Sequence, residues 1–293
     1  MPTKLNVSLD RTYSGHKQSV YCMCSDAAEG FYTAGSDGFV VHWKSKSHEN
    51  GELFAQIPEP IFSLAFVEEL EMILAGTQSG KLYYLKKGSQ PVVFELHTKS
   101  IFGIYVVSMD QIYTVGGDGF LHHIDWYRRK LKSIQLSSSS LRVVLCRNQE
   151  LFVAGSSSEI FKLTSDFQVE QSWKAHGNSI FALCANENFL VSGGRDAKIK
   201  VWNNLHQIEH AIDAHWYTIH GLAFSPNNQY LVSTSMDKTI RIWDAVSFKL
   251  LKVIDQLKFQ GHKSSVNACL WIDDGCFVTC SDDNSIKCWQ IIP

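Results

Sequence analysis

Residues that could carry out hydrolytic chemistry recur four times along this chain of 293 residues. One set is His176, Ser192 and Asp196, and a histidine, a hydroxyl residue and an aspartate return at similar spacing in three other places. If such side chains meet, they supply a nucleophile, a general base and an orienting carboxylate. One active site needs only one set, however, so four copies favour a structural role. The Gly-x-Ser-x-Gly turn that exposes a nucleophilic serine is missing from the sequence.

Metal and nucleotide sites find little support in the residue spacing. Among eight cysteines, Cys22 and Cys24 are spaced Cys-x-Cys, and no Cys-x-x-Cys pair occurs. His122 and His123 are adjacent, so on a strand they point to opposite faces. A zinc site needs about four convergent ligands, and the Gly-x-x-x-x-Gly-Lys-Ser/Thr loop of P-loop enzymes is missing. We therefore expect no functional metal and no cofactor.

The overall composition is typical of a globular protein. The hydrophobic fraction is 45% and the charged fraction 19%, which is enough apolar surface for a large core. A net charge of −2 provides no basic field for a polyphosphate backbone, so nucleic acid is not the expected partner. The sequence contains no apolar run long enough for a membrane span and no secretion signal. We expect reduced cysteines and a cytoplasmic location.

The elements that position these residues come from an internal repeat. Seven copies of one pattern are found at Phe31–Trp43, Ile73–Leu85, Ile112–Ile124, Phe152–Leu163, Leu190–Trp202, Leu231–Trp243 and Phe277–Trp289. A period of roughly 40 residues with strand-like content predicts a blade of four strands. We therefore predict an all-β fold, a seven-bladed β-propeller in which residues 1–293 form one domain.

The two ends of the chain are expected to close the ring. The seventh copy stops at Pro293, after its third strand, and Lys4–Tyr13 precede the first copy as a spare strand. A blade cannot cover both of its faces alone, so neighbouring blades must stack and the ring must close. We predict that the N-terminal strand completes the last blade.

The repeat resembles that of the WD-repeat family, in which a Gly-His pair precedes a Trp-Asp pair. Here Gly15-His16 pairs with Trp43, Gly261-His262 with Trp289, Ala175-His176 with Trp202, and Ala214-His215 with Trp243. The third copy keeps His97, Thr114 and Asp118 but has Ile124 in place of tryptophan, and copies two and four rest on period and apolar pattern alone. The overall organisation is similar to that of small stand-alone bacterial WD-repeat proteins.

The resemblance implies that a histidine, a serine or threonine, an aspartate and a tryptophan of one blade form a hydrogen-bonded tetrad. Carried over by position, the tetrads are His16, Thr33, Asp37 and Trp43; His176, Ser192, Asp196 and Trp202; His215, Ser233, Asp237 and Trp243; and His262, Thr279, Asp283 and Trp289. A closed network would satisfy all of these buried polar groups together. We expect the tetrads to be structural and not catalytic.

The resemblance also implies that partners bind the narrow top face of the ring. The family positions that reach it give Tyr21, Phe62, Phe102, Arg142, Phe181, His220 and Asn267 on the inner strands, and Arg195, Met236 and Asp282 in the upper turns. Trp216 and Tyr217, which follow His215, are expected on the same side. Aromatic residues and arginine are enriched in binding hot spots, although the aromatic side chains could instead only plug the centre. Arg142 and Arg195 could together clamp a carboxylate or phosphate.

We expect a monomeric, non-enzymatic interaction scaffold that binds a protein or peptide, the partner possibly acidic. Two alternatives remain open: an enzyme with an active site in the propeller channel, and a nucleic-acid-associated scaffold. The second alternative depends on a basic patch with interleaved aromatic residues, at Trp126–Lys130 and Lys132. We expect this patch on an outer hairpin at the lower face. The Ser137–Ser140 run is expected to be a short loop, and Asp255–Gln260 a larger upper loop.

Overall fold

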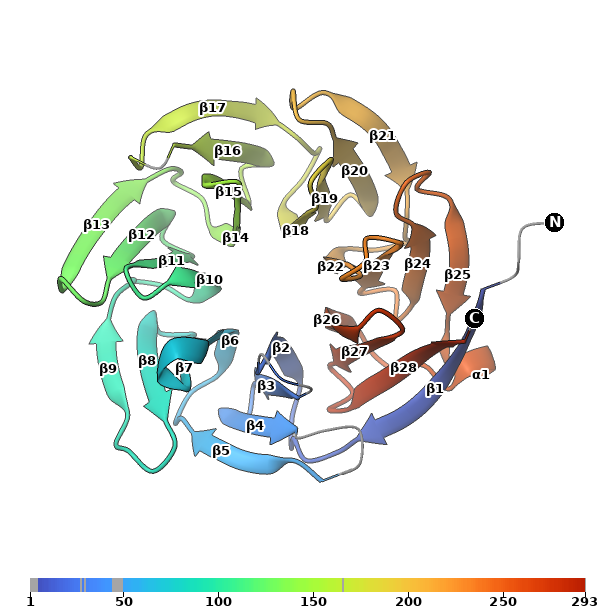
Figure 1. The fold of residues 1–293 in the computed structure, drawn as a ribbon, viewed down its shortest axis with the longest axis horizontal. Helices are drawn as coiled ribbons and strands as arrows, with labels where there is room; N and C mark the ends of the chain where they lie inside the picture. The colour runs from blue at the N-terminus through green and yellow to red at the C-terminus, as the bar shows by residue number, and fades with distance from the viewer. Residues whose placement is uncertain (1–4, 27, 29, 44–49, 165, 293) are drawn as a thin grey trace.

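Seven four-stranded antiparallel sheets surround a central axis, as the computed structural model shows (Figure 1). The structure describes residues 5–26, 28, 30–43, 50–164 and 166–292. The innermost strand of each sheet lies nearest the axis, and the outermost strand forms the rim of the ring (Figure 1). The predicted seven-bladed propeller is therefore confirmed. We number the blades in chain order from the first inner strand.

The first four blades each follow one continuous segment of the chain. Blade one consists of β2 (Val20–Ser25), β3 (Phe31–Gly35), β4 (Phe39–Trp43) and β5 (Glu52–Gln56). Blade two consists of β6 (Ile61–Val67), β7 (Met72–Thr77), β8 (Lys81–Lys86) and β9 (Val92–Glu95), with the 3-10 turn η1 (Glu68–Leu70) after β6. Blade three consists of β10 (Ile101–Ser108), β11 (Gln111–Gly116), β12 (Phe120–Asp125) and β13 (Lys130–Gln135). Blade four consists of β14 (Leu141–Arg147), β15 (Glu150–Gly155), β16 (Glu159–Leu163) and β17 (Val169–Lys174).

Blades five and six also follow continuous segments, whereas blade seven combines strands from both ends of the chain. Blade five consists of β18 (Ile180–Ala185), β19 (Leu190–Gly194), β20 (Lys198–Trp202) and β21 (Ile208–Asp213). Blade six consists of β22 (Ile219–Phe224), β23 (Tyr230–Ser235), β24 (Ile240–Asp244) and β25 (Leu250–Ile254). Blade seven consists of β26 (Val266–Asp273), β27 (Cys276–Ser281), β28 (Ile286–Ile292) and β1 (Asn6–Tyr13).

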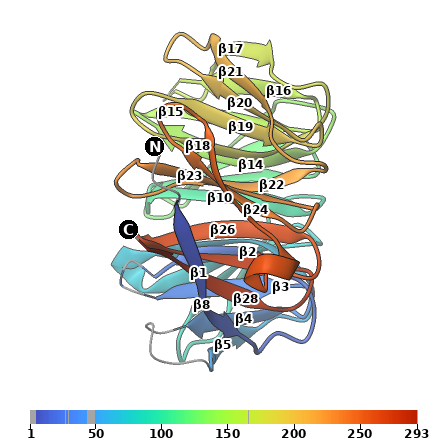
Figure 2. The same cartoon turned by 90° about the vertical axis from the view of Figure 1, so that its right-hand side faces the viewer.

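The β1 strand closes the ring by pairing antiparallel with β28 (Figure 2). Its register places Val7 opposite Ile291 and Tyr13 opposite Ile286, and both Val7 and Tyr13 are buried. The predicted closure by the N-terminal segment is confirmed for Asn6–Tyr13, while Lys4 lies outside the described residues. Burial of these apolar side chains fixes β1 against the sheet edge that would otherwise be unpaired.

A left-handed backbone residue ends the turn between the second and third strands in every blade. These residues are Gly38, Gly80, Gly119, Ser158, Ala197, Lys238 and Asn284. Glycine adopts this conformation without a steric cost, and three of the seven blades use it. In five blades the residue before the left-handed one is an aspartate, and its carboxylate lies at the start of the third strand. These aspartates are Asp37, Asp118, Asp196, Asp237 and Asp283.

The core is divided among the seams between blades. Each of seven apolar clusters joins two neighbouring blades, as Val20, Trp43 and Val278 do between blades one and seven. Apolar side chains on alternate positions of the strands face these seams on both sides. The ring is thus stabilised by stacking, because a single blade has no core of its own.

Two connections bear on the sequence expectations. Ser137–Ser140 form a short loop before β14, as expected. Asp255–Gln260 were expected to form a loop, but they contain a one-turn helix, α1 (Gln256–Phe259). The Asp255 carboxylate accepts a hydrogen bond from the backbone N–H of Lys258, at 2.8 Å, and this cap satisfies a donor that a loop would leave to water. None of the described helices has the length and apolar character needed to cross a membrane.

Candidate functional site

Blade six brings together the four residues of one predicted tetrad. Its aspartate, histidine and serine are hydrogen-bonded in the same sequence as in a hydrolase triad. His215 Nδ1 lies 2.9 Å from Asp237, and His215 Nε2 lies 2.8 Å from the hydroxyl of Ser233. Because the carboxylate only accepts, Nδ1 donates, and the Ser233 hydroxyl donates to Nε2. The indole N–H of Trp243 donates to the same hydroxyl oxygen, at 2.9 Å. The serine oxygen is therefore fully engaged in hydrogen bonds.

The other three tetrads repeat this network. The histidine Nε2 lies 2.8 Å from Thr33, Ser192 and Thr279 in blades one, five and seven, and the indoles of Trp43, Trp202 and Trp289 donate to the same hydroxyls. His16, His176 and His262 contact Asp37, Asp196 and Asp283 through Nδ1. All four hydroxyl residues are fully buried. The hydroxyls are thus out of reach of a substrate in this structure, and each network connects neighbouring strands of its blade.

Burial and hydrogen bonding shift the pKa values of the histidine and the aspartate in the tetrads of blades six and seven. Burial lowers the pKa of His215, although Asp237 opposes this effect, so the imidazole is neutral at pH 7. Burial would raise the pKa of Asp237, but hydrogen bonds from His215, Thr239 and the Trp216 backbone hold it well below its usual value. His262 and Asp283 are shifted in the same directions.

Blade three carries a variant of the network. His97 contacts Asp118 and Thr114, each at 2.9 Å, and His122 lies edge-on to the His97 ring with centroids 4.3 Å apart. As expected, His123 points the other way and stacks on Tyr113. The possible ligand atoms of His97, Asp118 and His122 lie within 4.8 Å of one another.

Among the described residues, this three-residue cluster is the one group whose side chains could together hold a cation. Both ring nitrogens of His97 are already engaged, and His122 Nδ1 lies 2.7 Å from the Ser133 hydroxyl. Burial, followed by the neighbouring His97, lowers the pKa of His122 to about 4. Thr114 and Asp118 occupy His97, and Ser133 occupies His122 Nδ1, so the geometry is that of a polar packing cluster. The sequence analysis missed the role of His122, because nothing marks which strand face turns toward His97.

Seven inner-strand residues, one from each blade, line the centre of the top face. We define the top face by the turns that carry the tetrad aspartates, and we call these residues the mouth ring: Tyr21, Phe62, Phe102, Arg142, Phe181, His220 and Asn267. Each is the second residue of its strand and follows a fully buried apolar residue. Each is also the residue skipped in the pairing of the first and second strands. A β-bulge at this point re-aims the side chain.

Side-chain contacts join six of the seven mouth-ring residues, from Tyr21 to His220. The ring of Tyr21 stacks on Phe62 with centroids 5.2 Å apart, and Phe62 contacts Phe102 at 5.6 Å. The guanidinium of Arg142 lies 4.8 Å from the Phe102 ring centre and 4.4 Å from that of Phe181. On the far side Phe181 meets His220 edge-on, at 5.3 Å. Six of the family positions therefore lie next to one another on the top face, and their role in binding a partner stays a prediction.

The upper turns add charge and exposed apolar surface beside the mouth ring. Burial lowers the pKa of Arg142, and the positive charge of Arg195 lowers it further. The two guanidiniums are therefore close enough for their charges to interact. Within the described ranges, no carboxylate lies at ion-pair distance from either arginine. Asp282 instead accepts a hydrogen bond from Asn267, at 2.8 Å, on the other side of the ring.

Blade six presents the exposed part of this surface. Trp216 is 82% exposed, Tyr217 61% and Met236 52%. The Trp216 backbone N–H donates to Asp237, at 3.0 Å, and the Tyr217 carbonyl accepts from Ser235. The backbone is therefore held by the tetrad turn while the two aromatic side chains remain free to contact another molecule.

Four segments, residues 8–44, 167–203, 206–244 and 254–290, match the family described as WD domain, G-beta repeat, and together they cover just over half of the chain. The chain belongs to the WD40-repeat family. The matched segments are the copies that carry complete tetrads in this WD40 protein, and blades two to four are the divergent ones. WD40 propellers typically act as protein-interaction scaffolds, and most are not enzymes.

Relatives of this WD40 protein are found among eukaryotic proteins. It is 22% identical to "Actin-interacting protein 1" of Caenorhabditis elegans over 97% of this chain and 48% of that protein. It is 24% identical to "Intraflagellar transport protein 80 homolog" of Rattus norvegicus over 78% of this chain and 31% of that protein. The chain thus spans less than half the length of these curated relatives. The expected similarity to small bacterial WD-repeat proteins finds no support, because the matching relatives are eukaryotic.

A solved structure shares the fold over nearly its whole length. The WD40 β-propeller domain of Doa1 superposes with a TM-score of 0.86, at 18% identity, over 98% of this chain and 97% of that chain. At this identity the likeness concerns the fold alone. The residues of the WD40 mouth ring must therefore be judged by their own chemistry.

Proposed function

We propose that this chain is a non-enzymatic scaffold that holds a protein or peptide partner on its top face. The mouth ring carries the proposal, because seven bulged positions bring four aromatic residues and an arginine to one place. Tyrosine, tryptophan and arginine are enriched among the few residues that dominate binding energy in known interfaces. The tetrad hydroxyls are buried, which argues against a hydrolase at those clusters.

The partner is an extended segment with an acidic or phosphorylated residue. Arg142 is held between Phe102 and Phe181, and its Nε donates to Ser156, at 3.3 Å, so its orientation is fixed before binding. Arg195 is exposed and lies close enough to influence Arg142. Two cations without a carboxylate partner favour an anion, and the flanking phenyl rings favour an apolar neighbour.

Affinity capture from the native cell tests the proposal with matched variants. A double variant, Arg142→Met with Arg195→Ala, removes both charges while methionine keeps contact with the two phenyl rings. A lower-face variant, Arg128→Ala with Arg129→Ala, removes the same number of charges. We expect the top-face variant to lose the partner and the lower-face variant to keep it, with both melting near wild type. The reverse result would place the partner on the lower face.

Location and oligomeric state belong to the same proposal. All eight cysteines are buried or half-buried, and we propose that they are reduced thiols in a reducing compartment such as the cytoplasm. We propose that the scaffold works as a monomer, with residues 1–293 as one domain.

A further inference from the structure

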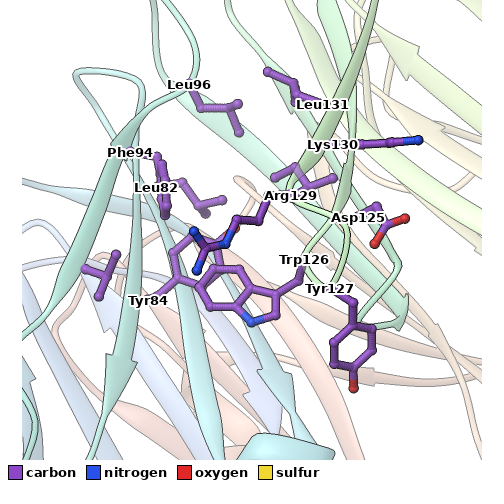
Figure 3. Close-up of a pocket in the computed structure, with 12 residues that line it drawn as sticks. Leu82, Tyr84, Phe94, Leu96, Asp125, Trp126, Tyr127, Arg129, Lys130 and Leu131 are labelled. Carbon is purple, nitrogen blue, oxygen red and sulfur yellow. The ribbon is translucent and has the colours of Figure 1, made fainter.

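A groove opens at the outer rim between blades two and three. It has a volume of about 590 Å³, and we call it the blade 2–3 groove (Figure 3). Its floor is a stack of Tyr84 on Trp126, with ring centroids 4.4 Å apart, and Phe94 meets Tyr84 edge-on at 5.3 Å. Leu82 and Leu131 complete the apolar lining. The aromatic floor is preformed by contacts within the protein.

In blade three Trp126 packs on Tyr84 of the preceding blade, but the left-handed position of the same turn carries no aromatic ring, unlike the turns of three other blades. In blades four, five and six, the turn between the third and fourth strands contains Phe167, His206 and Phe248, each with a left-handed backbone. Each ring packs on the preceding blade: Phe167 on Tyr113 at 6.5 Å, His206 on Trp173 at 4.7 Å, and Phe248 on Phe189 at 5.3 Å.

The corresponding residue of blade three is Arg129. Its backbone is also left-handed, with φ of 52°, so the turn has the same shape. Figure 3 shows its side chain directed over the aromatic floor. A guanidinium cannot fill the seam as a phenyl ring does, because it must keep contact with water or an anion. The apolar seam therefore stays open.

The walls of the groove expose apolar side chains that lie next to one another. Val92 is 48% exposed, Phe94 46% and Leu131 54%. Val92 and Phe94 lie on β9, whose four residues are all exposed and which forms the edge of its sheet. A contiguous exposed apolar patch on a sheet edge is typical of a surface that binds another chain.

The charge around the groove is positive. Asp125 is neutralised by Arg128, whose guanidinium lies 2.8 Å from the carboxylate. Arg129 and Lys130 line the groove, and within the described residues neither forms an ion pair. A partner that covers the apolar floor and also carries a negative charge would complement both features.

We propose that the blade 2–3 groove binds an extended segment of a partner protein that carries a bulky apolar side chain beside an acidic residue. The apolar side chain takes the seam position that Phe167, His206 and Phe248 occupy in their own blades. The acidic residue pairs with Arg129 or Lys130. A protein segment fits better than nucleic acid, because the floor is apolar and a carboxylate stands at the rim. There the Tyr127 hydroxyl donates a hydrogen bond to Glu69, at 2.9 Å. The site is separate from the mouth ring.

A peptide selection tests this proposal on the whole protein. Random dodecapeptides displayed on phage are selected on wild type after subtraction on Arg129→Phe, which inserts the side chain found in blades four and six. Selected peptides are labelled and titrated by fluorescence anisotropy. Arg129→Lys keeps the charge, Phe94→Ser alters the wall, and Leu257→Ser serves as control, because Leu257 is 95% exposed on α1.

The expected peptides combine Phe, Trp or Leu with a neighbouring Asp or Glu. Their affinity falls at least tenfold on Arg129→Phe and on Phe94→Ser, and stays within about threefold on Arg129→Lys, on Leu257→Ser and on the top-face double variant. Arg129→Phe also melts no lower than wild type. The proposal is overturned if no peptide distinguishes wild type from Arg129→Phe, or if the peptides lack acidic residues. It is also overturned if a 20-mer oligothymidylate binds wild type and is lost on Arg129→Phe.

Discussion

Arg142 stacks its guanidinium on the ring of Phe181 across the seam between blades four and five, with 4.4 Å between the guanidinium carbon and the ring centre. The aromatic contact holds the cation in place while its charge remains unpaired by any carboxylate of the described residues. For the partner recovered on wild type, we expect Arg142→Met with Arg195→Ala to weaken binding by about 2–5 kcal/mol, a typical magnitude for a desolvated charge contact.

Salt separates this contact from apolar binding. If an anion is bound, the wild-type dissociation constant rises with added sodium chloride, whereas that of the double variant changes little. Isothermal titration at low and high salt measures both. Equal salt dependence in the two proteins would contradict an anion contact at the mouth ring.

Removal of β1 should open the ring. Deleting residues 1–11 leaves most of β28 without its outer neighbour and uncovers the apolar surface that Val7 buries. We expect a lower melting temperature and aggregation through the free edge, measured by thermal melts and light scattering. Asn6→Ala, an exposed position on the same strand, is the control and should behave as wild type. A monomeric truncated protein with an unchanged melt would contradict the closure.

Loss of a tetrad histidine should cost stability and not chemistry. In His176→Ala, the buried hydroxyl of Ser192 and the carboxylate of Asp196 lose their common partner. We expect the free energy of unfolding to fall by about 1–3 kcal/mol, as for other buried groups left unsatisfied. Denaturant titration measures it. An unchanged stability with lost partner binding would instead indicate a direct functional role.

Acid should destabilise the folded chain through the tetrads. Burial lowers the pKa of His215 below that of an unfolded histidine, so the unfolded state takes up the proton first and stability falls as the pH drops below about 6.5. Asp237, whose folded pKa is lowered, contributes stability above its unfolded pKa that is lost at still lower pH. We expect the free energy of unfolding to fall between pH 7 and pH 5, and less steeply in His215→Gln. Parallel curves for the two proteins would argue against this linkage.

The seven blades should unfold together. Every apolar cluster spans two blades, so no blade retains a core once its neighbour is lost. We expect a single calorimetric transition for the whole chain, consistent with one domain. Two separated transitions would divide the ring into independent units.

The repeat predicted the blades because each blade must present apolar side chains to both neighbouring seams. The same strand length and the same alternation of apolar residues therefore return in every copy. The tetrads were assigned by family position. The hydrogen bonds among His262, Thr279 and Trp289 give that assignment a physical reason, because a shared network satisfies these buried groups together. The mouth ring was located by family position. Its physical basis, a β-bulge at each of the seven residues, is invisible in the sequence, because the bulged position accepts Tyr, Arg, His or Asn alike.

The blade 2–3 groove was not predicted for a different reason. Trp126–Lys130 were interpreted as a basic patch with interleaved aromatic residues, and residues of this segment line the groove. Its partner Phe94 lies on another blade, and the sequence does not show which rings fill a seam. The decisive difference, Arg129 in place of Phe or His, can be recognised only when the left-handed turn residues of several blades are compared in space.

The pairing of β1 with β28 also sets an order of events during synthesis. Within this chain β1 is synthesised well before the strand with which it pairs, since Tyr13 pairs with Ile286. At a translation rate of about 5–20 residues per second, that interval is roughly 15 to 60 seconds. During this time the other blades can stack in sequence, but β1 has no partner. Until β28 is made, β1 is a strand without its neighbour, and such a strand can pair with another chain instead of its own.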